Sequence, residues 1–462
     1  MLQGGTPPAQ VASGGCVPAC AKRGESPPRR QASARVRLPS ATRVSRLRPH
    51  ARRADDSMTK KRQNILIGQS GGPTAVINQS LWGLVSTLHG ERGVRHLLGA
   101  RRGVEGLLAG DLVDLRATGR RRWKAVAGTP GAALGSVRKK PDAAECARLL
   151  ERLEELEVRH FAYIGGNDSA ETASILEGLA RAQGRDLSVW HVPKTIDNDL
   201  RVTDHCPGYG SAARFVACAF LGDEEDNRSL GGVKINVLMG RDAGWLTAAS
   251  VLARTREDSA PHLVYVPERV FDLSSFLADV DATVKRIGRC VVAVSEGVRD
   301  ASGAPIGASG EKDSHGNLQL SGSGHLGDFL SSAVKARLGI KRVRADTFGY
   351  LQRSFAGCVS AVDAEEAFAA GAFAAEAMLA GRERGGSVVL EREARRKYRS
   401  KCRLVEVAKL AKATRPLDER FLATGPDIAG SFVEWALPLV GELPEVAQLE
   451  PGRWSPRPRA RD

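Results

Sequence analysis

Three apolar runs in this chain are each followed at once by a short loop of glycine and polar residues. The runs are 65–68, 161–164 and 187–192, and their loops are 70–74, 165–169 and 193–199. Short uninterrupted apolar runs are typical of strands that a parallel sheet buries on both faces. Open α/β sheets bind ligands in loops at the carboxyl ends of such strands. The sequence therefore predicts a parallel sheet whose carboxyl edge carries one phosphate-handling site.

Amphipathic segments separate the predicted strands. Apolar residues recur at helical spacing over 77–88, and a second helix is predicted to open at Pro141 and Asp142 and to end near residue 156. Three later runs also have the character of buried strands: 233–238, 263–266 and 290–295. Residues 301–324 are rich in glycine and serine, which is typical of a loop or lid. This alternation predicts an α/β fold of doubly wound layers in two domains.

Residues 1–57 and 451–462 at the two ends lack hydrophobic periodicity, so neither is expected to fold. The first segment carries 11 lysine and arginine residues against three acids, which supplies +8 of the net charge of +15. Its arginine- and serine-rich, acid-poor composition fits an organelle transit peptide. It also fits a disordered tail, and the interpretation that we favour is an over-long gene model whose natural start is Met58.

The charge that remains after this segment is +7 over 405 residues, which suits anionic small substrates as well as nucleic acid. No nucleic-acid-binding motif accompanies it. No apolar stretch approaches the roughly 20 residues that span a bilayer. The eight cysteines show no framework spacing, which indicates free thiols in a reducing compartment. We therefore expect a cytoplasmic protein without a nucleic-acid or membrane partner.

The loop 193–199 places two carboxylates, Asp197 and Asp199, two residues apart. In phosphoryl transfer one carboxylate can take the proton of an attacking hydroxyl while another holds a metal ion or its waters. Lys194 in the same loop can neutralise the charge of a phosphate in transfer. The alternative interpretation is an Asx turn with solvated acids.

The two earlier loops carry glycine before a predicted helix. Gly72 and Gly166 would let the backbone of a helix amino terminus approach a phosphate, although a tight strand-to-helix turn needs glycine as well. The amide oxygen of Asn167 can bind Mg²⁺ directly or through water. A carboxylate at Asp168 would repel a phosphate, so it is a cation ligand, a barrier to a bulkier anion, or a cap of the following helix.

Later loops add arginines and one acid. Arg241 follows one strand-like run, Glu268 follows another, and Arg344 precedes Arg353 by nine residues. Arginine binds phosphate in a bidentate manner, and a glutamate can accept hydrogen bonds from sugar hydroxyls. Each of these residues taken alone is more often an ordinary surface residue.

Seven motifs occur along the chain in the order Gly71-Gly72, GGNDS (165–169), PKTIDND (193–199), GYGSAA (208–213), MGRDAGW (239–245), PE (267–268) and GYLQR (349–353). Together they closely resemble the 6-phosphofructokinase family over about residues 63–440. The resemblance implies two doubly wound, Rossmann-like domains with interleaved chain connections. The donor domain would comprise 58–208 plus about 352–400, and the fructose 6-phosphate domain 209–351 plus about 401–450.

The family has ATP-using and pyrophosphate-using members. Where ATP users typically have glycine, this chain has Asp168 and Lys194, and Tyr350 stands where they usually have histidine. The resemblance implies reversible phosphoryl transfer from pyrophosphate to the 1-hydroxyl of fructose 6-phosphate, giving fructose 1,6-bisphosphate and phosphate in glycolysis. Three alternatives stay open: an ATP-dependent member, a non-catalytic sugar-phosphate-binding regulatory subunit, and nucleic-acid binding through residues 1–57.

The resemblance also implies a role for individual residues. Catalysis would rest on Asp197 as the base for the sugar hydroxyl, with Lys194, Asp168 and Arg241. Fructose 6-phosphate would be bound by Thr195, Asp197, Met239, Gly240, Arg241, Glu268, Arg344, Tyr350 and Arg353. Pyrophosphate would be bound by Gly72, Arg138, Gly166, Asp168 and Lys194, and Mg²⁺ by Asn167 and Asp199. Arg344 would reach the site of a neighbouring subunit, which implies a homodimer or homotetramer.

Three positions depart from the common family pattern. Asn167 stands where many members have a metal-binding aspartate, and Ser354 replaces a common glycine. Gly232 stands where many members have a second phosphate-binding arginine from the neighbouring subunit. Lys234 lies two residues further on, on the same face of the predicted strand, and is the expected substitute.

Overall fold

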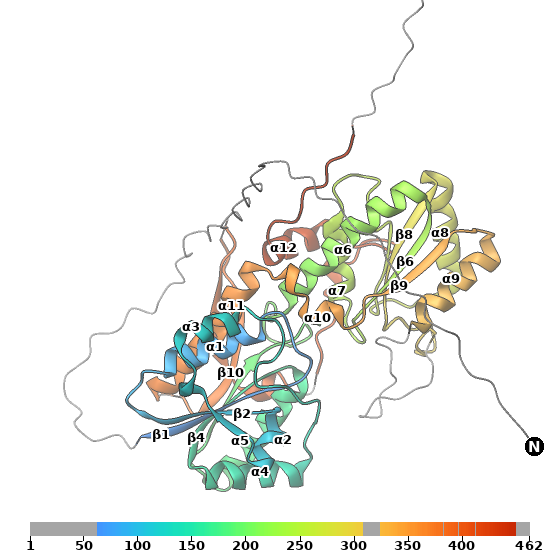
Figure 1. Cartoon of the computed structure of the whole chain (residues 1–462). Helices are drawn as coiled ribbons and strands as arrows, with labels where there is room; N and C mark the ends of the chain where they lie inside the picture. The colour runs from blue at the N-terminus through green and yellow to red at the C-terminus, as the bar shows by residue number, and fades with distance from the viewer. Residues whose placement is uncertain (1–61, 308–323, 382, 396, 412, 450–462) are drawn as a thin grey trace, which may run out of the picture. The chain divides into compact units, whose positions relative to one another are not determined.

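The computed structural model describes residues 62–307, 324–381, 383–395, 397–411 and 413–449. The predictions for 1–57 and 451–462, and for most of the loop or lid at 301–324, lie outside these ranges. The described residues pack as one compact unit that contains two sheets (Figure 1).

The first sheet has seven strands in the order β11 (Ser400–Val405), β10 (Gly385–Arg392), β5 (Ser188–Pro193), β4 (Val158–Gly165), β1 (Gln63–Gln69), β2 (Val94–Ala100) and β3 (Leu112–Asp114). The five inner strands run parallel, and β11 and β3 are antiparallel edges. The three predicted strands β1, β4 and β5 are neighbours at its centre, so their carboxyl ends meet at one edge.

The second sheet has four parallel strands in the order β7 (Leu263–Tyr265), β8 (Arg289–Ser295), β6 (Gly232–Leu238) and β9 (Val343–Thr347). Three of these strands were predicted from their apolar runs. Parallel strands need crossover connections, and helices supply them here.

The helices are α1 (Ile77–Leu88), α2 (Gly103–Ala109), α3 (Arg120–Ala127), α4 (Ala143–Glu155), α5 (Asn167–Ala182), α6 (Tyr209–Leu230), α7 (Trp245–Ala248), α8 (Leu273–Ile287), α9 (His325–Leu338), α10 (Leu351–Ser354), α11 (Ala361–Ala380) and α12 (Gly430–Val440). Short 3₁₀ turns lie at η1 (Leu115–Ala117), η2 (Ala249–Ala253), η3 (Ala356–Cys358), η4 (Val407–Lys409) and η5 (Glu419–Phe421). Both predicted helices are confirmed as α1 and α4. A capping box between Asp142 and Glu145 fixes the start of α4.

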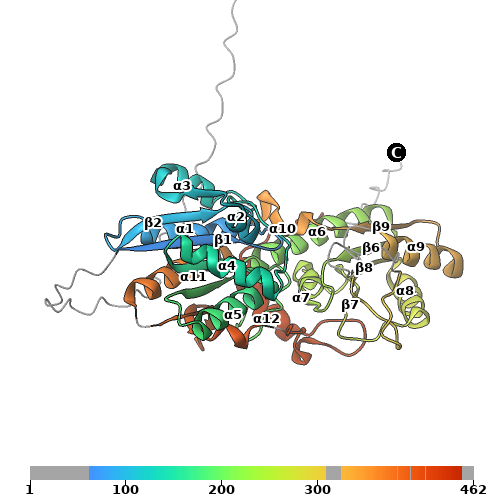
Figure 2. The ribbon, with the colours of Figure 1, turned by 90° about the horizontal axis from the view of Figure 1, so that it is seen from below.

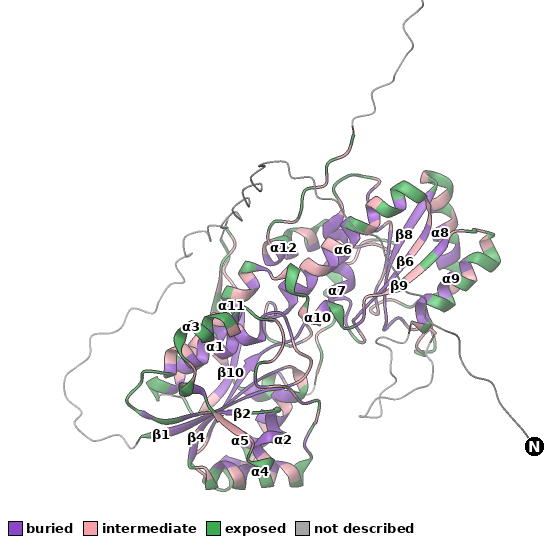
Figure 3. Cartoon of the chain, in the orientation of Figure 1, coloured by how far each residue is buried: buried purple, intermediate pink, exposed green. Residues whose placement is uncertain are grey.

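Successive residues of the central strands point to opposite faces of the first sheet, and helices cover both faces (Figure 2). Ile65, Ile67 and Ile164 pack on the side of α1 and α11. Leu66 and Phe161 pack on the side of α4 and α5. Burial on both faces explains why these strands are continuous apolar runs rather than alternating ones (Figure 3).

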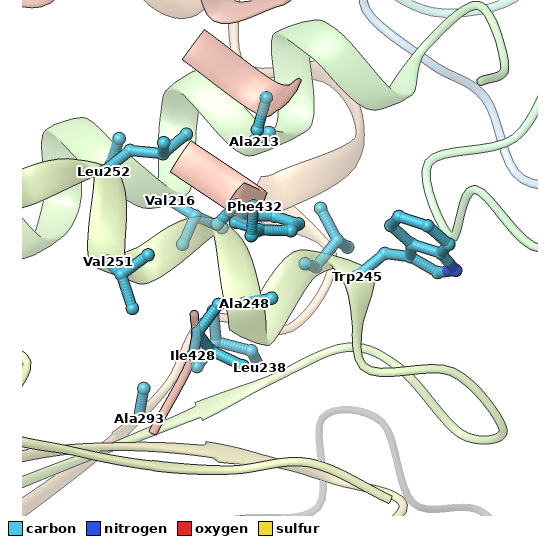
Figure 4. Packing of buried hydrophobic residues seen from close by; sticks show 14 of the residues in the cluster. Ala213, Val216, Leu238, Trp245, Ala248, Val251, Leu252, Ala293, Ile428 and Phe432 are labelled. Carbon is cyan, nitrogen blue, oxygen red and sulfur yellow. The ribbon is translucent and has the colours of Figure 1, made fainter. Parts of the chain in front are cut away.

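The second sheet is covered in the same way. On one face α8 and α9 pack on Val233, Ile235 and Val292. On the other face Leu238 and Ala293 contribute to a cluster with α6, α7, η2 and α12, where Phe432 inserts (Figure 4). The predicted doubly wound α/β fold is confirmed.

The predicted division into a donor and a sugar domain stays a prediction. One of its boundaries, near residue 400, falls at the start of β11, which pairs with β10 of the first sheet.

Two further expectations concern the cysteines and the absence of a membrane-spanning helix. The six cysteines of the described residues are free thiols. None of the helices described here is long and apolar enough to cross a bilayer.

Candidate functional site

The loops after β1, β4, β5 and β6 line one cavity of about 300 Å³. Twelve of the residues expected at the site line it: Gly72, Arg138, Gly166, Asn167, Asp168, Lys194, Thr195, Asp197, Asp199, Met239, Arg241 and Arg353. The cavity therefore lies at the carboxyl ends of strands from both sheets, where an open α/β fold binds its ligands.

The loop after β1 brings backbone, lysine and arginine together. The ammonium of Lys194 donates a 2.8 Å hydrogen bond to the carbonyl of Gly72. A Cβ at Gly71 would lie 3.0 Å from that ammonium, and a Cβ at Gly72 would lie 3.1 Å from Nε of Arg353. A side chain at either position would crowd these cations, and Gly71 also has a positive φ of 75° that favours glycine.

Lys194 is only 3% exposed. Burial lowers the pKa of its ammonium to about 8, and the guanidinium of Arg353 contributes in the same direction. Burial also lowers the pKa of Arg353, with Arg138 as the next cause. Cations held this close, and partly desolvated, are stabilised by a polyanion, so this side of the cavity suits a phosphate chain.

The amino terminus of α5 forms the next wall. Gly166 precedes the helix, and Asn167 and Asp168 are its first two residues. The first amides of a helix have no partner within the helix, and they attract anions. A Cβ at Gly165 would lie 2.0 Å from Oγ of Ser169, so only glycine permits this sharp strand-to-helix turn. Asp168 is exposed at the cavity, where its carboxylate opposes the anion-binding character of the helix end.

The segment after β5, residues 194–205, carries the two carboxylates that line the cavity, Asp197 and Asp199, and is called the carboxylate loop below. Thr195 pairs with Gly208 in an isolated bridge, and its Oγ1 accepts a 3.1 Å bond from the amide of Asp197. Asn198 has a positive φ of 55°, which lets Asp197 and Asp199 both face the cavity. Burial raises the pKa of Asp197. Burial, followed by repulsion from Asp197, raises the pKa of Asp199 to about 7.

Two oxygens of this wall are suited to a cation. Nδ2 of Asn167 donates a 2.6 Å hydrogen bond to Oδ2 of Asp199. Oδ1 of each residue is buried and has no hydrogen-bond partner among the described residues. No group of three or more His, Cys, Asp or Glu side chains in the described part of the chain forms a metal site. The two oxygens fit Mg²⁺, which is commonly held by one or two protein ligands together with substrate phosphates and water.

The loop after β6 forms the opposite wall. Met239 and Gly240 are buried, and Arg241 lines the cavity. Gly240 has a φ of 145°, and a Cβ there would lie 2.5 Å from the carbonyl of Ala243. Ser295 donates a 2.6 Å hydrogen bond to the carbonyl of Gly240. This bond holds the loop in place beneath Arg241.

Glu268 follows β7 and does not line the cavity. Its Oε1 accepts hydrogen bonds from the amides of Gly244 at 2.8 Å and Leu417 at 2.6 Å. Its Oε2 is buried without a hydrogen-bond partner among the described residues, and burial raises the pKa of the carboxyl. An unsatisfied buried oxygen of this kind is stabilised by a donor such as a sugar hydroxyl.

Residues 64–378 match the family model described as Phosphofructokinase. The chain belongs to the phosphofructokinase family. It is 46% identical over 395 residues to the pyrophosphate–fructose 6-phosphate 1-phosphotransferase of Rhodospirillum rubrum, which covers 84% of this chain and 97% of the relative. It is 41% identical to the enzyme of the same name from Xanthomonas campestris pv. campestris, over 82% of this chain and 92% of the relative.

Among solved structures, the chain is similar to the pyrophosphate-dependent phosphofructokinase from Nitrosospira multiformis. The TM-score is 0.75 at 32% sequence identity, and the match covers 85% of this chain and 95% of the other. The phosphofructokinase fold therefore extends over nearly the whole described chain.

Four of the residues expected in this phosphofructokinase do not line the cavity: Gly240, Glu268, Arg344 and Tyr350. Tyr350 is 51% exposed, and its ring lies 4.3 Å from the guanidinium of Arg353 and 5.9 Å from that of Arg138. The ring of Tyr350 thus contacts the guanidinium groups of both Arg353 and Arg138. Arg344 is exposed on β9, the edge strand of the second sheet, and does not line the cavity. Its role towards a neighbouring subunit stays a prediction.

Lys234, the expected substitute for the missing arginine at Gly232, lies on β6 beside β9. Its ammonium forms an ion pair with Asp346 and lies 3.7 Å from a carboxylate oxygen of Asp223. Two acids therefore already neutralise this lysine within its own chain.

Sequence reasoning missed two acids that line the cavity of this phosphofructokinase, Asp242 and Glu296. Glu296 is 5% exposed and lines the cavity directly after β8. A signal existed, because Ser295, Glu296 and Gly297 repeat the pattern of an apolar strand followed by a polar residue and glycine. The glycine is required here, since a Cβ at Gly297 would lie 2.0 Å from the carbonyl of Arg241.

Proposed function

We propose that this chain is a pyrophosphate-dependent 6-phosphofructokinase. It transfers a phosphoryl group reversibly from pyrophosphate to the 1-hydroxyl of fructose 6-phosphate, giving fructose 1,6-bisphosphate and phosphate. The observation that carries the proposal is that Asp168 and buried Lys194 line the same cavity as Asp197. The relatives at 46% and 41% identity carry the name of this activity.

The donor binds on the first-sheet side of the cavity. The backbone at Gly72 and Gly166 approaches the phosphates, and Arg138 and Lys194 neutralise their charge. Oδ1 of Asn167 and Oδ1 of Asp199 would hold Mg²⁺, which would supply positive charge next to the pyrophosphate oxygens when bound. The exposed carboxylate of Asp168 stands where a longer phosphate chain would continue, and it repels such a chain.

The sugar binds on the second-sheet side. Arg241 contacts its 6-phosphate together with Arg344 of a neighbouring subunit and with Arg353, which reaches it from beside Gly72 on the donor side. Glu268 accepts from a ring hydroxyl. Thr195, Met239 and Gly240 set the position of the sugar, and Tyr350 orients Arg353 through the contact between its ring and the guanidinium. Such an arrangement brings the 1-hydroxyl into line with the donor phosphate, which is how most of the rate of phosphoryl transfer is gained.

Asp197 acts as the general base. Its carboxylate takes the proton of the 1-hydroxyl as the oxygen attacks the terminal phosphorus and the bridging P–O bond of pyrophosphate breaks. Lys194 stabilises the negative charge that gathers on the departing phosphate. In the reverse direction the protonated Asp197 returns its proton to the sugar oxygen. The presence of Asp197, Asp199 and Arg241 in one cavity favours an enzyme over a non-catalytic regulatory subunit.

The proposal includes the metal, the oligomeric state and the compartment. The metal is Mg²⁺, the active form is a homodimer or homotetramer with shared sites, and the compartment is the cytoplasm. The free thiols of the described cysteines support a reducing compartment.

A donor assay tests the function directly. Purified protein is given fructose 6-phosphate and Mg²⁺ with either pyrophosphate or ATP, and fructose 1,6-bisphosphate is measured. We expect turnover with pyrophosphate to exceed turnover with ATP by at least about two orders of magnitude, which corresponds to roughly 3 kcal/mol in the barrier. A preference for ATP would contradict the assignment.

A further inference from the structure

Arg415, more than 200 residues from the carboxylate loop in sequence, binds that loop by both its backbone and its side chain. Its amide donates a 2.7 Å hydrogen bond to the carbonyl of Asp199. Its Nη2 donates a 2.8 Å hydrogen bond to the carbonyl of Asn198. Arg415 therefore binds the backbone carbonyls on both sides of the Asp199 side chain, those of Asn198 and Asp199.

The same guanidinium also holds the far end of the loop. Its Nη1 donates to the carbonyl of Asp204 at 2.9 Å and to the carbonyl of Thr203. A planar fork of five N–H donors can serve several carbonyls at once in a fixed geometry. The point charge of a lysine cannot reproduce that geometry.

The loop that Arg415 holds is strained. Asn198 and Val202 have positive φ angles of 55° and 65°. This region is uncommon for residues other than glycine and is a clear outlier for a β-branched residue such as valine. The carbonyl of Asn198 and the segment just after Val202 are the points at which the guanidinium binds. Such a conformation persists only when its surroundings hold it in place.

Arg415 also connects the loop to the sugar side of the site. Its guanidinium lies 4.7 Å from the ring centroid of Trp245, and its carbonyl accepts a 3.3 Å hydrogen bond from the indole of Trp245. Two residues further on, the amide of Leu417 donates to Oε1 of Glu268. The segment 415–417 thus binds both the carboxylate loop and Glu268, the acid proposed to bind the sugar.

We propose that Arg415 is a positioning residue for phosphoryl transfer. Arg415 does not line the cavity, so we expect it to act through the loop and not through a contact with either substrate. It fixes Asp197 and Asp199 relative to each other and to Glu268, so that base, metal ligand and sugar-binding acid keep one geometry. This inference rests on the proposed function for its kinetic consequence, while its structural consequence is measured without any substrate.

The test compares the wild type with Arg415→Lys, Arg415→Ala and a matched control, Lys409→Ala. Lys409 lies on the neighbouring η4 turn, is exposed, and contacts only Glu406 at 3.8 Å among the ion pairs of the described residues. Steady-state kinetics with pyrophosphate, melting temperature, and amide hydrogen exchange of peptides from 194–205 are measured for each protein.

We expect Arg415→Lys to lower kcat by about tenfold to a hundredfold, since a displacement of about 1 Å costs this much in an oriented reaction. The KM for fructose 6-phosphate should stay within about threefold of the wild type, because the lost interaction is not a substrate contact. Exchange should rise in peptides of the carboxylate loop and stay unchanged elsewhere. Guanidinium ion at millimolar concentration should restore part of the kcat of Arg415→Ala, and Lys409→Ala should behave as wild type.

Several results would overturn the inference. They are a kcat of Arg415→Lys within twofold of the wild type, unchanged exchange in the loop, or faster exchange spread over the whole protein. If Arg415→Ala does not fold, Arg415→Lys decides alone. A wild type without pyrophosphate turnover would refute the proposed function, and the exchange of the loop would then still decide whether Arg415 holds it.

Discussion

Asn167 donates its amide hydrogen to Asp199 at 2.6 Å, and each of the two residues keeps one buried oxygen without a partner among the described residues. An amide and a carboxylate in contact can share one cation without the repulsion that two carboxylates would have. The arrangement is therefore stable before the metal binds. Because Asp199 is the only charged member of this pair, the pair holds the cation less strongly than two carboxylates would.

Replacing Asn167 by aspartate should strengthen metal binding, because a second negative ligand is added. We expect Asn167→Asp to lower the half-saturating Mg²⁺ concentration for turnover by about threefold to tenfold, as cation affinity follows ligand charge. The measurement is turnover against free Mg²⁺ at fixed pyrophosphate. Glu177→Gln, a change at a half-buried residue of the same helix that does not line the cavity, is the control. An unchanged or higher Mg²⁺ requirement would remove Asn167 from the metal site.

The second prediction concerns the base. Asp197→Asn keeps the shape of the side chain and removes its ability to take a proton, so we expect kcat to fall by roughly 10²–10⁴-fold. The KM values should change little, because the base acts on the bound sugar. Asp281→Asn, a change at a half-exposed residue on α8 that does not line the cavity, should leave both constants unaltered. Retention of more than about a tenth of the wild-type kcat would assign the proton transfer to another group.

Local sequence patterns predicted the central strands and most of the cavity wall. The reason is physical: β1, β4 and β5 are buried on both faces, so they appear as unbroken apolar runs, and their loops need glycine at helix starts. Lys194, Asp197 and Asp199 follow from those loops directly. The antiparallel edge strand β11, whose residues are mostly half-exposed, gives no such run.

Contacts between distant segments could not be predicted in this way. Arg415 binds the carboxylate loop across more than 200 residues, and nothing near it in sequence marks that role. Glu296 lacked the paired acids that drew attention to the loop after β5. The buried cluster of His205, Asp204 and Glu366 was missed for the same reason as Arg415, because Glu366 lies on α11, 161 residues from His205.

The third prediction concerns pH and stability. His205 is buried between Asp204 at 2.8 Å and Glu366 at 2.7 Å, and Glu366 also accepts a hydrogen bond from Tyr398. Burial alone would lower the pKa of His205, but Glu366 and Asp204 outweigh it and raise the pKa from 6.5 to about 9. A raised pKa means that the folded state binds the proton more tightly than the unfolded state.

The resulting stabilisation is fully present below pH 6.5 and is lost as the pH rises through about 9. A shift of this size corresponds to at most about 3 kcal/mol. We expect the melting temperature of the wild type to fall between pH 6.5 and 9.5 more steeply than that of His205→Gln. His96→Gln, an exposed histidine on β2, should keep the wild-type slope. Equal slopes for wild type and His205→Gln would show that His205 is neutral in the folded protein.

The fourth prediction concerns shared sites. Arg344 is exposed on the edge strand β9 and does not line the cavity of its own chain. Mixing Arg344→Ala protein with Asp197→Ala protein should restore activity, because a hybrid oligomer contains one site that has both residues. Subunit exchange is first verified with two differently tagged wild-type chains. Exchange without any recovered turnover would mean that each chain completes its own site.

The last prediction concerns the choice of donor. Asp168 is exposed at the amino terminus of α5, whereas Lys194 is buried against Gly72, and both line the cavity. Asp168→Gly removes charge and bulk together, so turnover with ATP should rise while turnover with pyrophosphate falls. Asp168→Asn removes only the charge, and its ATP turnover relative to Asp168→Gly separates repulsion from steric exclusion.

Lys194→Met is the companion variant for the donor. We expect it to lower kcat with pyrophosphate by roughly 10²–10³-fold, since one charge contact in a desolvated phosphate site contributes about 3–4 kcal/mol. ATP turnover should not rise, because the carboxylate of Asp168 still opposes the longer phosphate chain. The ratio of kcat/KM for ATP and pyrophosphate is the measurement for all three variants. If Lys194→Met admitted ATP as well as Asp168→Gly does, the barrier to ATP would lie in the lysine and not in the acid.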